Sequence, residues 1–329
     1  MSEKENKTAK ASIGGQALIE GIMMMGPAGA AVSVRTPDGS IDTEKVPVKH
    51  IKDKIKFLGW PIIRGVVNYV ESMTFGYKCL MMSAEKSGLE NMEESDENSS
   101  KLDKWLNEHL NKKVMGVLTA VASVLGMGLA FLLFFYLPTV TVKFINELTG
   151  GAIEGLKALF EGVIRMCIFV LYIALVSLMK DIKRTFMYHG AEHKTIFCYE
   201  NDLELTVENV RKQSRFHPRC GTSFIFVIII ISVIISSAIS VTFKGVHDNT
   251  VLWMVIKLLI LPLVAGISYE FIKYAGKHDN IIVKILAAPG LWMQRLTTKE
   301  PDDSMIEVAI EAFNSALGEN TEDNKADEA

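Results

Sequence analysis

The longest apolar stretches of the chain predict membrane-spanning helices. Residues 114–137 and 224–243 contain no Asp, Glu, Lys or Arg, whereas residues 163–179 and 251–269 each contain a single cation. A helix needs roughly 20 mostly apolar residues to cross a hydrocarbon core of about 30 Å, and it satisfies its own backbone hydrogen bonds there. The pattern therefore predicts a mainly α membrane protein with four transmembrane helices.

Basic residues between these stretches predict how the chain is oriented. The connection at 180–223 contains Lys180, Lys183, Arg184, Lys194, Arg211, Lys212, Arg215 and Arg219, and the two connections on the opposite side contain Lys143, Lys157 and Lys244. Basic residues are retained on the cytoplasmic side of a membrane. We therefore expect the segment 180–223 and both termini to be cytoplasmic. The polar start MSEKENKTAK, which lacks the apolar core of a secretory signal, agrees with this orientation.

Shorter apolar stretches ahead of the first span predict a small β-subdomain at residues 13–50. The sequence Pro37-Asp38-Gly39-Ser40 is a turn signal between stretches at 30–35 and 41–48, a pattern typical of a β-hairpin. Residues 18–25 are expected to form its leading strand. The sheet is interpreted as structural.

An interrupted amphipathic helix is predicted at residues 55–84. Polar residues on one helical stripe divide its apolar sequence: Arg64, Asn68, Glu71 and Lys78. We favour a helix at the membrane interface with this stripe in water, over a stripe that lines a functional cavity. The acidic sequence at 85–100, rich in Ser and Asn, has the composition of a linker.

Residues 270–317 predict interfacial and amphipathic helices on the cytoplasmic side. An apolar stretch at 281–297 is broken at Pro289-Gly290, and a last helix at 304–317 follows Asp302, whose carboxylate can accept from free backbone N–H groups. The remaining divisions are the membrane domain at 101–269 and disordered ends at 1–12 and 318–329.

Composition and charge narrow the class of protein further. The 329 residues are 49% hydrophobic, with a positive mean hydropathy of +0.23, which disfavours a wholly soluble protein. A net charge of -3 argues against a nucleic-acid partner. Four scattered cysteines are too few for a disulfide framework in a chain of this length, so reduced thiols are expected.

The predicted cytoplasmic loop contains the candidate chemistry. His189, Glu192 and His193 form an H-x-x-E-H sequence, which on a helix places the two imidazoles one turn apart on one face. Further along the loop, His217 and Cys220 supply another imidazole and a thiol. These donors suit zinc or another borderline-soft divalent metal. We predict a metal site made of the three histidines and the cysteine, with Glu192 as general base or acid.

Two alternatives to the metal site remain open. The histidines lie beside basic residues near predicted membrane entries, so they could simply be solvated or contact lipid headgroups, with Cys220 packed as a small residue. A metal-free acid/base site is the other alternative.

Charged residues within the spans are interpreted as structural. Glu161 and Arg165 are four residues apart and are expected to form an ion pair. Lys257 lies about two turns into the last span, and we favour a side chain that snorkels to the interface over a functional role. The chain contains no glycine-rich phosphate-binding loop, which argues against an ATP-driven pump.

Four motifs resemble those of the YqhQ family of multi-span bacterial membrane proteins, whose function is unknown. They are GGQALIEGIMM at 14–24, HGAEHK at 189–194, HPRCGTSF at 217–224 and PGLWMQRLTTKEPDD at 289–303. The resemblance extends from about residue 13 to 317. The resemblance implies a bacterial membrane protein. Some family members carry the label of predicted metal-dependent enzyme, so the resemblance is also compatible with a metal site.

These observations predict an integral protein of the bacterial inner membrane with a metal site on its cytoplasmic face. The leading function is a metal-dependent hydrolase that acts at the membrane surface, with zinc as the expected cofactor. The alternative is a non-enzymatic scaffold, assembly factor or transporter component. The expected partners are the lipid bilayer and other membrane proteins or further copies of the chain.

Overall fold

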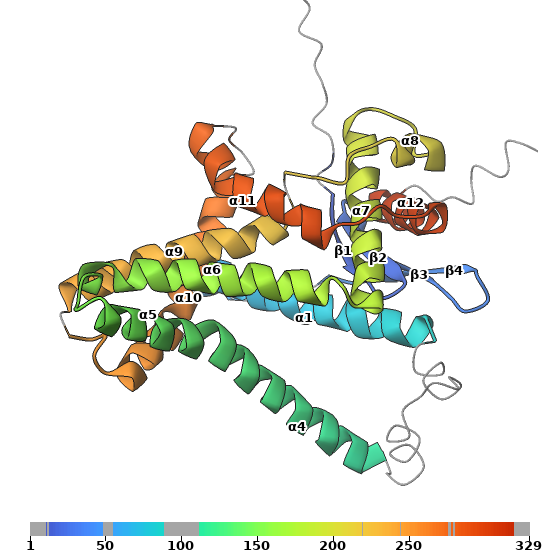
Figure 1. The fold of residues 1–329 in the computed structure, drawn as a ribbon. Coiled ribbons are helices and arrows are strands. Elements are labelled where there is room, and N and C mark those ends of the chain that lie inside the picture. Colours follow the sequence, from blue (N-terminus) through green and yellow to red (C-terminus); the bar gives the residue numbers. More distant parts are fainter. Residues whose placement is uncertain are drawn as a thin grey trace, which may run out of the picture.

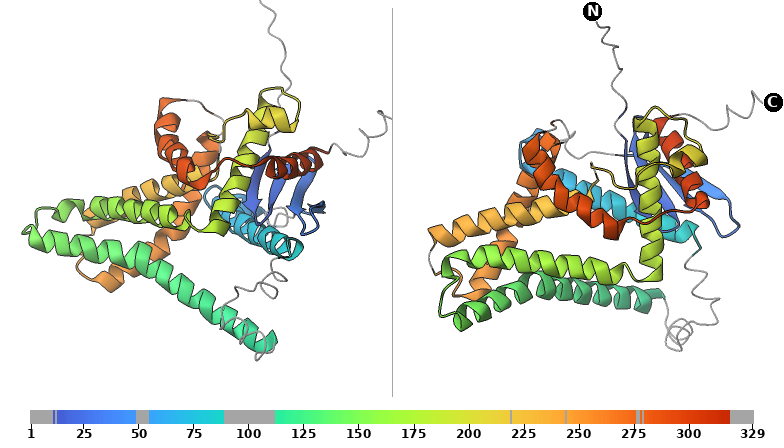
Figure 2. Two further views of the ribbon diagram at one scale, coloured as in Figure 1. Left: turned by 45° about the vertical axis from the view of Figure 1, so that its right-hand side comes forward. Right: turned by 45° about the horizontal axis from the view of Figure 1, so that its top comes forward.

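The computed structural model describes residues 11, 13–48, 55–88, 112–218, 220–243, 245–275, 278 and 280–318. Long helices form one part of the molecule, and a small sheet flanked by helices lies at one end of them (Figures 1 and 2). The predicted disordered ends and most of the predicted linker at 85–100 lie outside the described residues.

The elements follow in this order along the chain. The sheet contains β1 (Gly14–Leu18), β2 (Gly21–Gly26), β3 (Gly29–Arg35) and β4 (Ile41–Val46). The first helices are the 3-10 turn η2 (Lys56–Gly59), α1 (Ile63–Lys86), α4 (Lys112–Phe131), the π-helical turn η3 (Leu132–Tyr136), α5 (Leu137–Leu148), the 3-10 turn η4 (Glu154–Leu156) and α6 (Lys157–Val176). They are followed by α7 (Lys180–Glu200), α8 (Val207–Arg211), α9 (Thr222–Thr242), α10 (Thr250–Ala275), α11 (Ile281–Thr297) and α12 (Asp303–Leu317).

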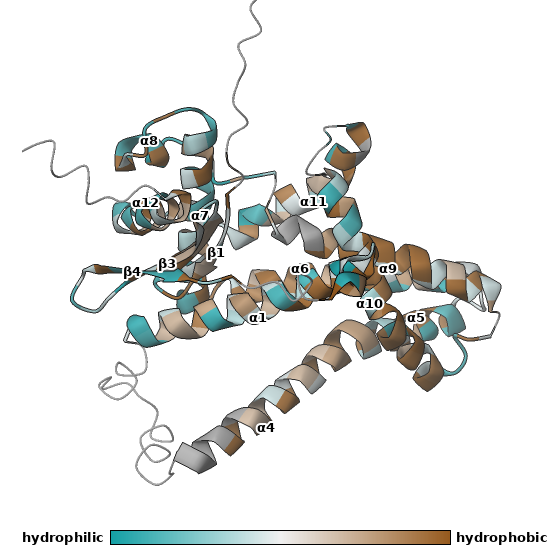
Figure 3. Cartoon of the chain, turned by 180° about the vertical axis from the view of Figure 1, so that it is seen from behind, coloured by the Kyte–Doolittle hydropathy of each residue, from teal (hydrophilic) through white to brown (hydrophobic). Residues whose placement is uncertain are grey.

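Four helical segments among the described residues are long and apolar enough to cross a membrane, as predicted. They are Ala120–Leu148, Glu154–Val176, Ile225–Thr242 and Thr250–Ala275. Figure 3 shows apolar residues concentrated along these helices, whereas the sheet and its flanking helices show hydrophilic and apolar residues together. The loops that join α5 to α6 and α9 to α10 lie at the end of the bundle remote from the sheet, here named the distal end (Figures 1 and 2).

The first span continues beyond its predicted end at residue 137, through Pro138 to Leu148. Pro138 has no N–H to donate to the carbonyl of Phe134, four residues before it. The chain forms the π turn η3 at this point, and Arg165 Nε of α6 donates to Phe134 O at 2.9 Å. The carbonyl that lacks its usual helical donor is therefore satisfied by a neighbouring span.

The four strands form an antiparallel sheet in the order β1-β2-β3-β4. The predicted hairpin is present as β3 and β4, but the single leading strand expected at 18–25 is wrong. The chain turns between Leu18 and Gly21, where Glu20 has a positive φ of 49° and its carbonyl accepts from Arg35 N at 2.8 Å. The turn divides the segment into two paired strands.

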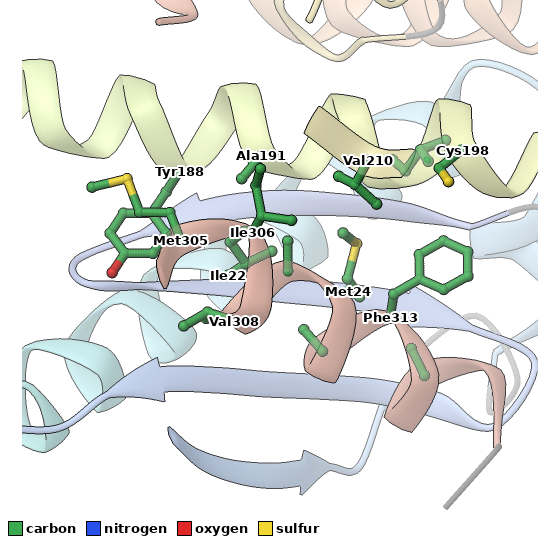
Figure 4. Close-up of a cluster of buried hydrophobic side chains, with 14 of the residues drawn as sticks. Ile22, Met24, Tyr188, Ala191, Cys198, Val210, Met305, Ile306, Val308 and Phe313 are labelled. Atoms are coloured by element: carbon green, nitrogen blue, oxygen red, sulfur yellow. The ribbon is translucent and has the colours of Figure 1, made fainter. Parts of the chain in front are cut away.

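Side chains of successive strand residues point to opposite faces of the sheet, and apolar side chains are buried on both faces. Ile22 and Met24 of β2 pack against α7 and α12, together with side chains such as Tyr188 and Phe313 (Figure 4). The opposite face packs against α1, where Cys79 is fully buried. The sheet thus lies between α1 on one side and the pair α7 and α12 on the other.

α12 begins close to its predicted start at residue 304. Asp302 Oδ1 accepts from Met305 N at 3.0 Å, the cap that its carboxylate predicts, and Gly318 ends the helix with φ 99°. α11 differs from the prediction because it is continuous through Pro289-Gly290. It packs against α9, and such tertiary packing provides a reason for the helix to persist through the proline.

The polar stripe of α1 is not a solvated face along its whole length. Arg64 Nε donates to Glu270 Oε1 of α10 at 2.6 Å, and Asn68 Nδ2 donates to Tyr269 Oη at 2.7 Å. A Cβ on Gly65 would lie 2.9 Å from the Gly266 backbone. The close approach of the two helices lets the first part of the stripe reach polar partners on the fourth span, so Arg64 and Asn68 are partly exposed and also pair within the protein.

Three charged residues of the spans, Glu161, Arg165 and Lys257, lie inside the bundle. The predicted Glu161–Arg165 ion pair is present, with 3.1 Å between Oε1 and Nη2. Lys257 is 3% exposed, and its Nζ donates to Glu161 Oε1 and, at 2.7 Å, to Thr139 Oγ1. Snorkelling of Lys257 to the interface is therefore wrong, because the side chain finds acceptors on α5 and α6.

Candidate metal centre

Two histidines of α7 use the same ring nitrogen to bond a backbone carbonyl. His189 Nδ1 lies 2.9 Å from Thr297 O, and His193 Nδ1 lies 2.6 Å from Arg215 O. A carbonyl oxygen only accepts, so each Nδ1 carries the proton and each Nε2 is left with its lone pair. A carbonyl partner of this kind is what orients metal-binding imidazoles in proteins.

Cys220 lies beside these two rings. Its Sγ is 3.4 Å from His189 Nε2, and one donor atom from each of His189, His193 and Cys220 lies within 4.8 Å of the others. We name these residues the three-donor cluster. Bond lengths of about 2.0 Å to nitrogen and 2.3 Å to sulfur in a tetrahedral zinc site place neighbouring ligands roughly 3.5 Å apart. Modest side-chain movement would therefore close the cluster around an ion.

The exposure of the cluster leaves room for a further ligand. His193 is buried, and His189 and Cys220 are partly exposed. Three protein ligands with one open position are typical of catalytic zinc sites, whereas structural sites carry four. The donor set and its partial exposure fit a divalent ion that also binds water or substrate.

One of the four predicted ligands, His217, is directed elsewhere. His217 Nε2 lies 3.2 Å from Glu200 Oε2, and its ring packs against Phe197 with 4.5 Å between ring centroids. Its ring centroid is 5.7 Å from that of His193. The structure thus brings together His189, His193 and Cys220, and it places the His217 side chain against the end of α7.

A buried glutamine holds the loop that leads to Cys220. Gln294 of α11 is 0% exposed; its Oε1 accepts from His217 N at 2.8 Å, and its Nε2 donates to His217 O at 2.7 Å. Earlier in the same connection, the carbonyl of Arg211 accepts from Lys194 Nζ of α7 at 2.9 Å. These bonds connect the loop backbone to α7 and α11, so the position of the thiol depends on both helices.

The side chain of Glu192, a residue of α7, lies against β1. It is buried, and a Cβ on Gly15 would lie 3.0 Å from its carboxyl carbon, so only glycine fits there without a shift. Burial raises the pKa of Glu192 to about 7, against the opposing effects of nearby His189 and of the Gly15 backbone N–H. Glu192 Oε2 has no hydrogen-bond partner among the described residues.

The segment after α11 lies directly against α7. A Cβ on Gly190 would lie 2.0 Å from Lys299 O, and Lys299 N donates to Phe186 O at 2.8 Å. This close approach places Thr297 O within reach of His189 Nδ1. Gly190 therefore matters to the cluster through backbone packing.

Several residues that support the cluster were not among the sequence predictions. Gln294 and Gly15 lie within the quoted motifs, so their segments were identified but their roles were not. Thr297 and Arg215 contribute backbone carbonyl oxygens, which every residue type possesses. No side-chain pattern could have indicated the last two.

Comparisons with known proteins identify the family. A family model described as a protein of unknown function, DUF1385, matches residues 60–319. The uncharacterized protein YqhQ of Bacillus subtilis (strain 168) is 37% identical over 308 residues, which cover 92% of each chain. The chain belongs to this family. No solved structure matches it.

Family membership confirms the resemblance inferred from the four motifs, and the structure brings those motifs together. The first contributes Gly15, the second His189 and His193, and the third Cys220. The fourth contributes Gln294, together with the carbonyl of residue 297. Segments far apart in the chain therefore meet at the three-donor cluster.

Proposed function

We propose that this chain is a multi-pass protein of the bacterial inner membrane that binds a divalent metal through the three-donor cluster, on the cytoplasmic face. Zinc is the ion that best suits two imidazoles and a thiolate. The observation that carries the proposal is the shared orientation of His189 and His193. Each donates Nδ1–H to a backbone carbonyl, which leaves Nε2 as the metal-binding nitrogen, and His189 Nε2 lies 3.4 Å from Cys220 Sγ.

The reaction class that fits this arrangement is hydrolysis. A bound metal would lower the pKa of water and so supply a nucleophile near neutral pH. Glu192 lies one residue before His193 on α7, and one of its oxygens has no partner among the described residues. In this proposal that oxygen accepts the proton of the nucleophile, and Gly15 N–H holds the carboxylate in place.

The position of the cluster favours a substrate held at the bilayer surface. Cys220 lies two residues before α9, whose membrane segment begins at Ile225. A site at a membrane entry suits a lipid headgroup or a membrane-tethered peptide. Lys194 and Arg215 both pair with Glu300, at 2.9 and 3.2 Å, so this carboxylate matches one of their two positive charges.

Metal analysis of detergent-purified protein after zinc loading tests the site. We expect about one metal per chain in the wild type, and its loss in His189→Ala, His193→Ala and Cys220→Ala. His278→Ala is a matched control, since His278 is exposed and lies outside the cluster. His217→Ala should keep the metal because its ring pairs with Glu200.

The hydrolytic role is tested separately. Glu192→Gln should retain the metal and lose turnover of any substrate found by screening, and retained turnover would contradict the role of Glu192. Absence of metal from well-folded, zinc-loaded wild type would refute the metal site and favour a non-enzymatic scaffold. Rescue of a deletion phenotype by the double variant His189→Ala, His193→Ala would also favour the scaffold.

Orientation has its own test. A reporter fused after Thr206, between α7 and α8, should register as cytoplasmic, because the segment 180–223 that contains this position is rich in basic residues. A periplasmic signal from this fusion would place the three-donor cluster on the other side of the membrane.

A further inference from the structure

A carboxylate and two cations lie buried among the membrane helices. Glu161 is 2% exposed and Lys257 is 3% exposed. Glu161 Oε1 accepts from Lys257 Nζ and, at 3.1 Å, from Arg165 Nη2, while Glu161 Oε2 accepts from Trp253 Nε1 at 3.1 Å. We name Glu161, Arg165 and Lys257 the intramembrane cluster. It connects α6 to α10, and Glu161 lies in the second turn of α6, which begins at the distal end (Figure 1).

The intramembrane cluster contains one carboxylate and two cations. Arg165 keeps its proton in proteins, and its nitrogens donate to Phe134 O at 2.9 Å, to Ser232 Oγ at 3.3 Å and to Glu161. With all three groups ionised, the cluster carries a surplus positive charge, which is unfavourable in a low-dielectric interior. Release of a proton from Lys257 Nζ to water leaves a neutral amine and a neutral cluster.

Charged groups on the neighbouring elements do not remove this surplus. Lys157 at the start of α6 pairs with Glu154 at 2.5 Å and faces Asp248 at 3.9 Å, and both of these carboxylates are more than half exposed. Lys143 Nζ of α5 donates to Asp248 O at 2.7 Å. These residues form a separate, charge-balanced group at the distal surface.

A buried histidine contacts the tryptophan that bonds Glu161. His247, in the connection before α10, is 6% exposed, and its ring centroid is 3.9 Å from the ring of Trp253, which donates to Glu161. Its buried Nε2 has no hydrogen-bond partner among the described residues. The molecule therefore has an unpartnered polar atom on the distal side of the Glu161–Lys257 pair.

We propose that Glu161 and Lys257 form a proton-exchange site of the membrane domain, which communicates with water at the distal end past His247. Protonated, Lys257 binds both Glu161 and Thr139; deprotonated, it weakens its bond to Glu161, and the carboxylate stays paired with Arg165. Because protonated Lys257 of α10 bonds both α5 and α6, proton occupancy changes the contacts among these three helices, while Arg165 keeps α6 bonded to η3 and α9. The membrane domain would thereby respond to proton supply from the distal side.

Trp253 provides the test. Its indole bonds Glu161, and Lys257 Nζ lies 5.1 Å from its ring centroid, so its fluorescence reports the charge of the pair. A variant with Trp60→Phe, Trp105→Phe and Trp292→Phe keeps Trp253 as the single tryptophan. In detergent, we expect one fluorescence transition between about pH 6 and pH 10. Burial lowers the pKa of His247 to about 4, so its own titration falls below this range.

Matched lysine variants separate the site from the surface. Lys257→Met should abolish the transition, whereas Lys157→Met, which removes an equally buried lysine from the surface group, should leave it unchanged. If Lys257→Met does not fold, the double variant Glu161→Gln, Lys257→Met keeps the wild-type surplus of one charge on Arg165 and should also lack the transition.

The route is tested by kinetics. After a pH jump, His247→Gln should slow the approach to the new fluorescence level several-fold and leave the transition midpoint in place. An unchanged rate would refute the route past His247. Absence of a transition in the folded single-tryptophan protein, or a transition that persists in Lys257→Met, would refute the proton-exchange site. None of these three outcomes depends on whether the three-donor cluster binds a metal.

Discussion

Gln294→Ala tests whether the three-donor cluster depends on a buried support that is not itself a ligand. The substitution removes two hydrogen bonds, to His217 N and to His217 O, inside a site where Gln294 is fully buried. A buried backbone group left without a partner costs about 1–3 kcal/mol. Two such groups give about 2–6 kcal/mol, and relaxation of the loop with entry of water reduces the effect toward the lower limit.

Part of that cost should be seen in metal binding, because ordering the loop before Cys220 would then have to be driven by the metal. A loss of about 2 kcal/mol corresponds to a Kd for zinc roughly 30-fold higher. The assay is competition with a chelating dye in detergent, with wild type and variant checked for fold by circular dichroism.

Gln213→Ala is the matched control. Gln213 lies in the same loop and also makes two hydrogen bonds, to Asn201 at 2.9 Å and to Asn209 O at 3.1 Å, but it is partly exposed, so water can replace them. Its zinc Kd should remain close to that of the wild type. Equal Kd values for Gln294→Ala and the wild type, in protein that binds zinc, would refute the idea that Gln294 positions the thiol.

Three further predictions concern the sheet and its flanking helices. Gly190→Ala would place a Cβ 2.0 Å from Lys299 O, so α7 and the following segment must separate; we expect a loss of about 1–3 kcal/mol, seen as a lower Tm. Asp302→Ala removes the α12 cap and should cost about 1 kcal/mol in denaturant unfolding. Hydrogen bonds from Thr36 and Ser40 lower the pKa of Asp38 to about 2. Its stabilising effect is therefore present above its ordinary pKa and lost as pH falls toward 2, and Thr36→Val should raise the midpoint of its carboxyl NMR shift.

The sequence alone determined the features that follow from local chemistry. Four apolar stretches had to be helices, because a lipid interior offers no partner for an unpaired backbone group. The turn at Pro37–Ser40 and the start of α12 at Asp302 were also predictable, since their side chains bond to backbone within a few residues. The segments that surround the three-donor cluster were also identified, because each of their motifs is a short run of adjacent residues.

The tertiary structure decided which distant groups meet. Lys257 was predicted to snorkel, but its acceptors on α5 and α6 are more than 90 positions away in the chain. His217 was predicted as a ligand beside the other two histidines, with Cys220 as the fourth, and the fold directs His217 to Glu200 and Cys220 to His189. The orientation of both cluster histidines depends on backbone carbonyls, which carry no sequence signal. Periodicity and capping act over a few residues, whereas the partners of a buried polar group are set by how the helices pack.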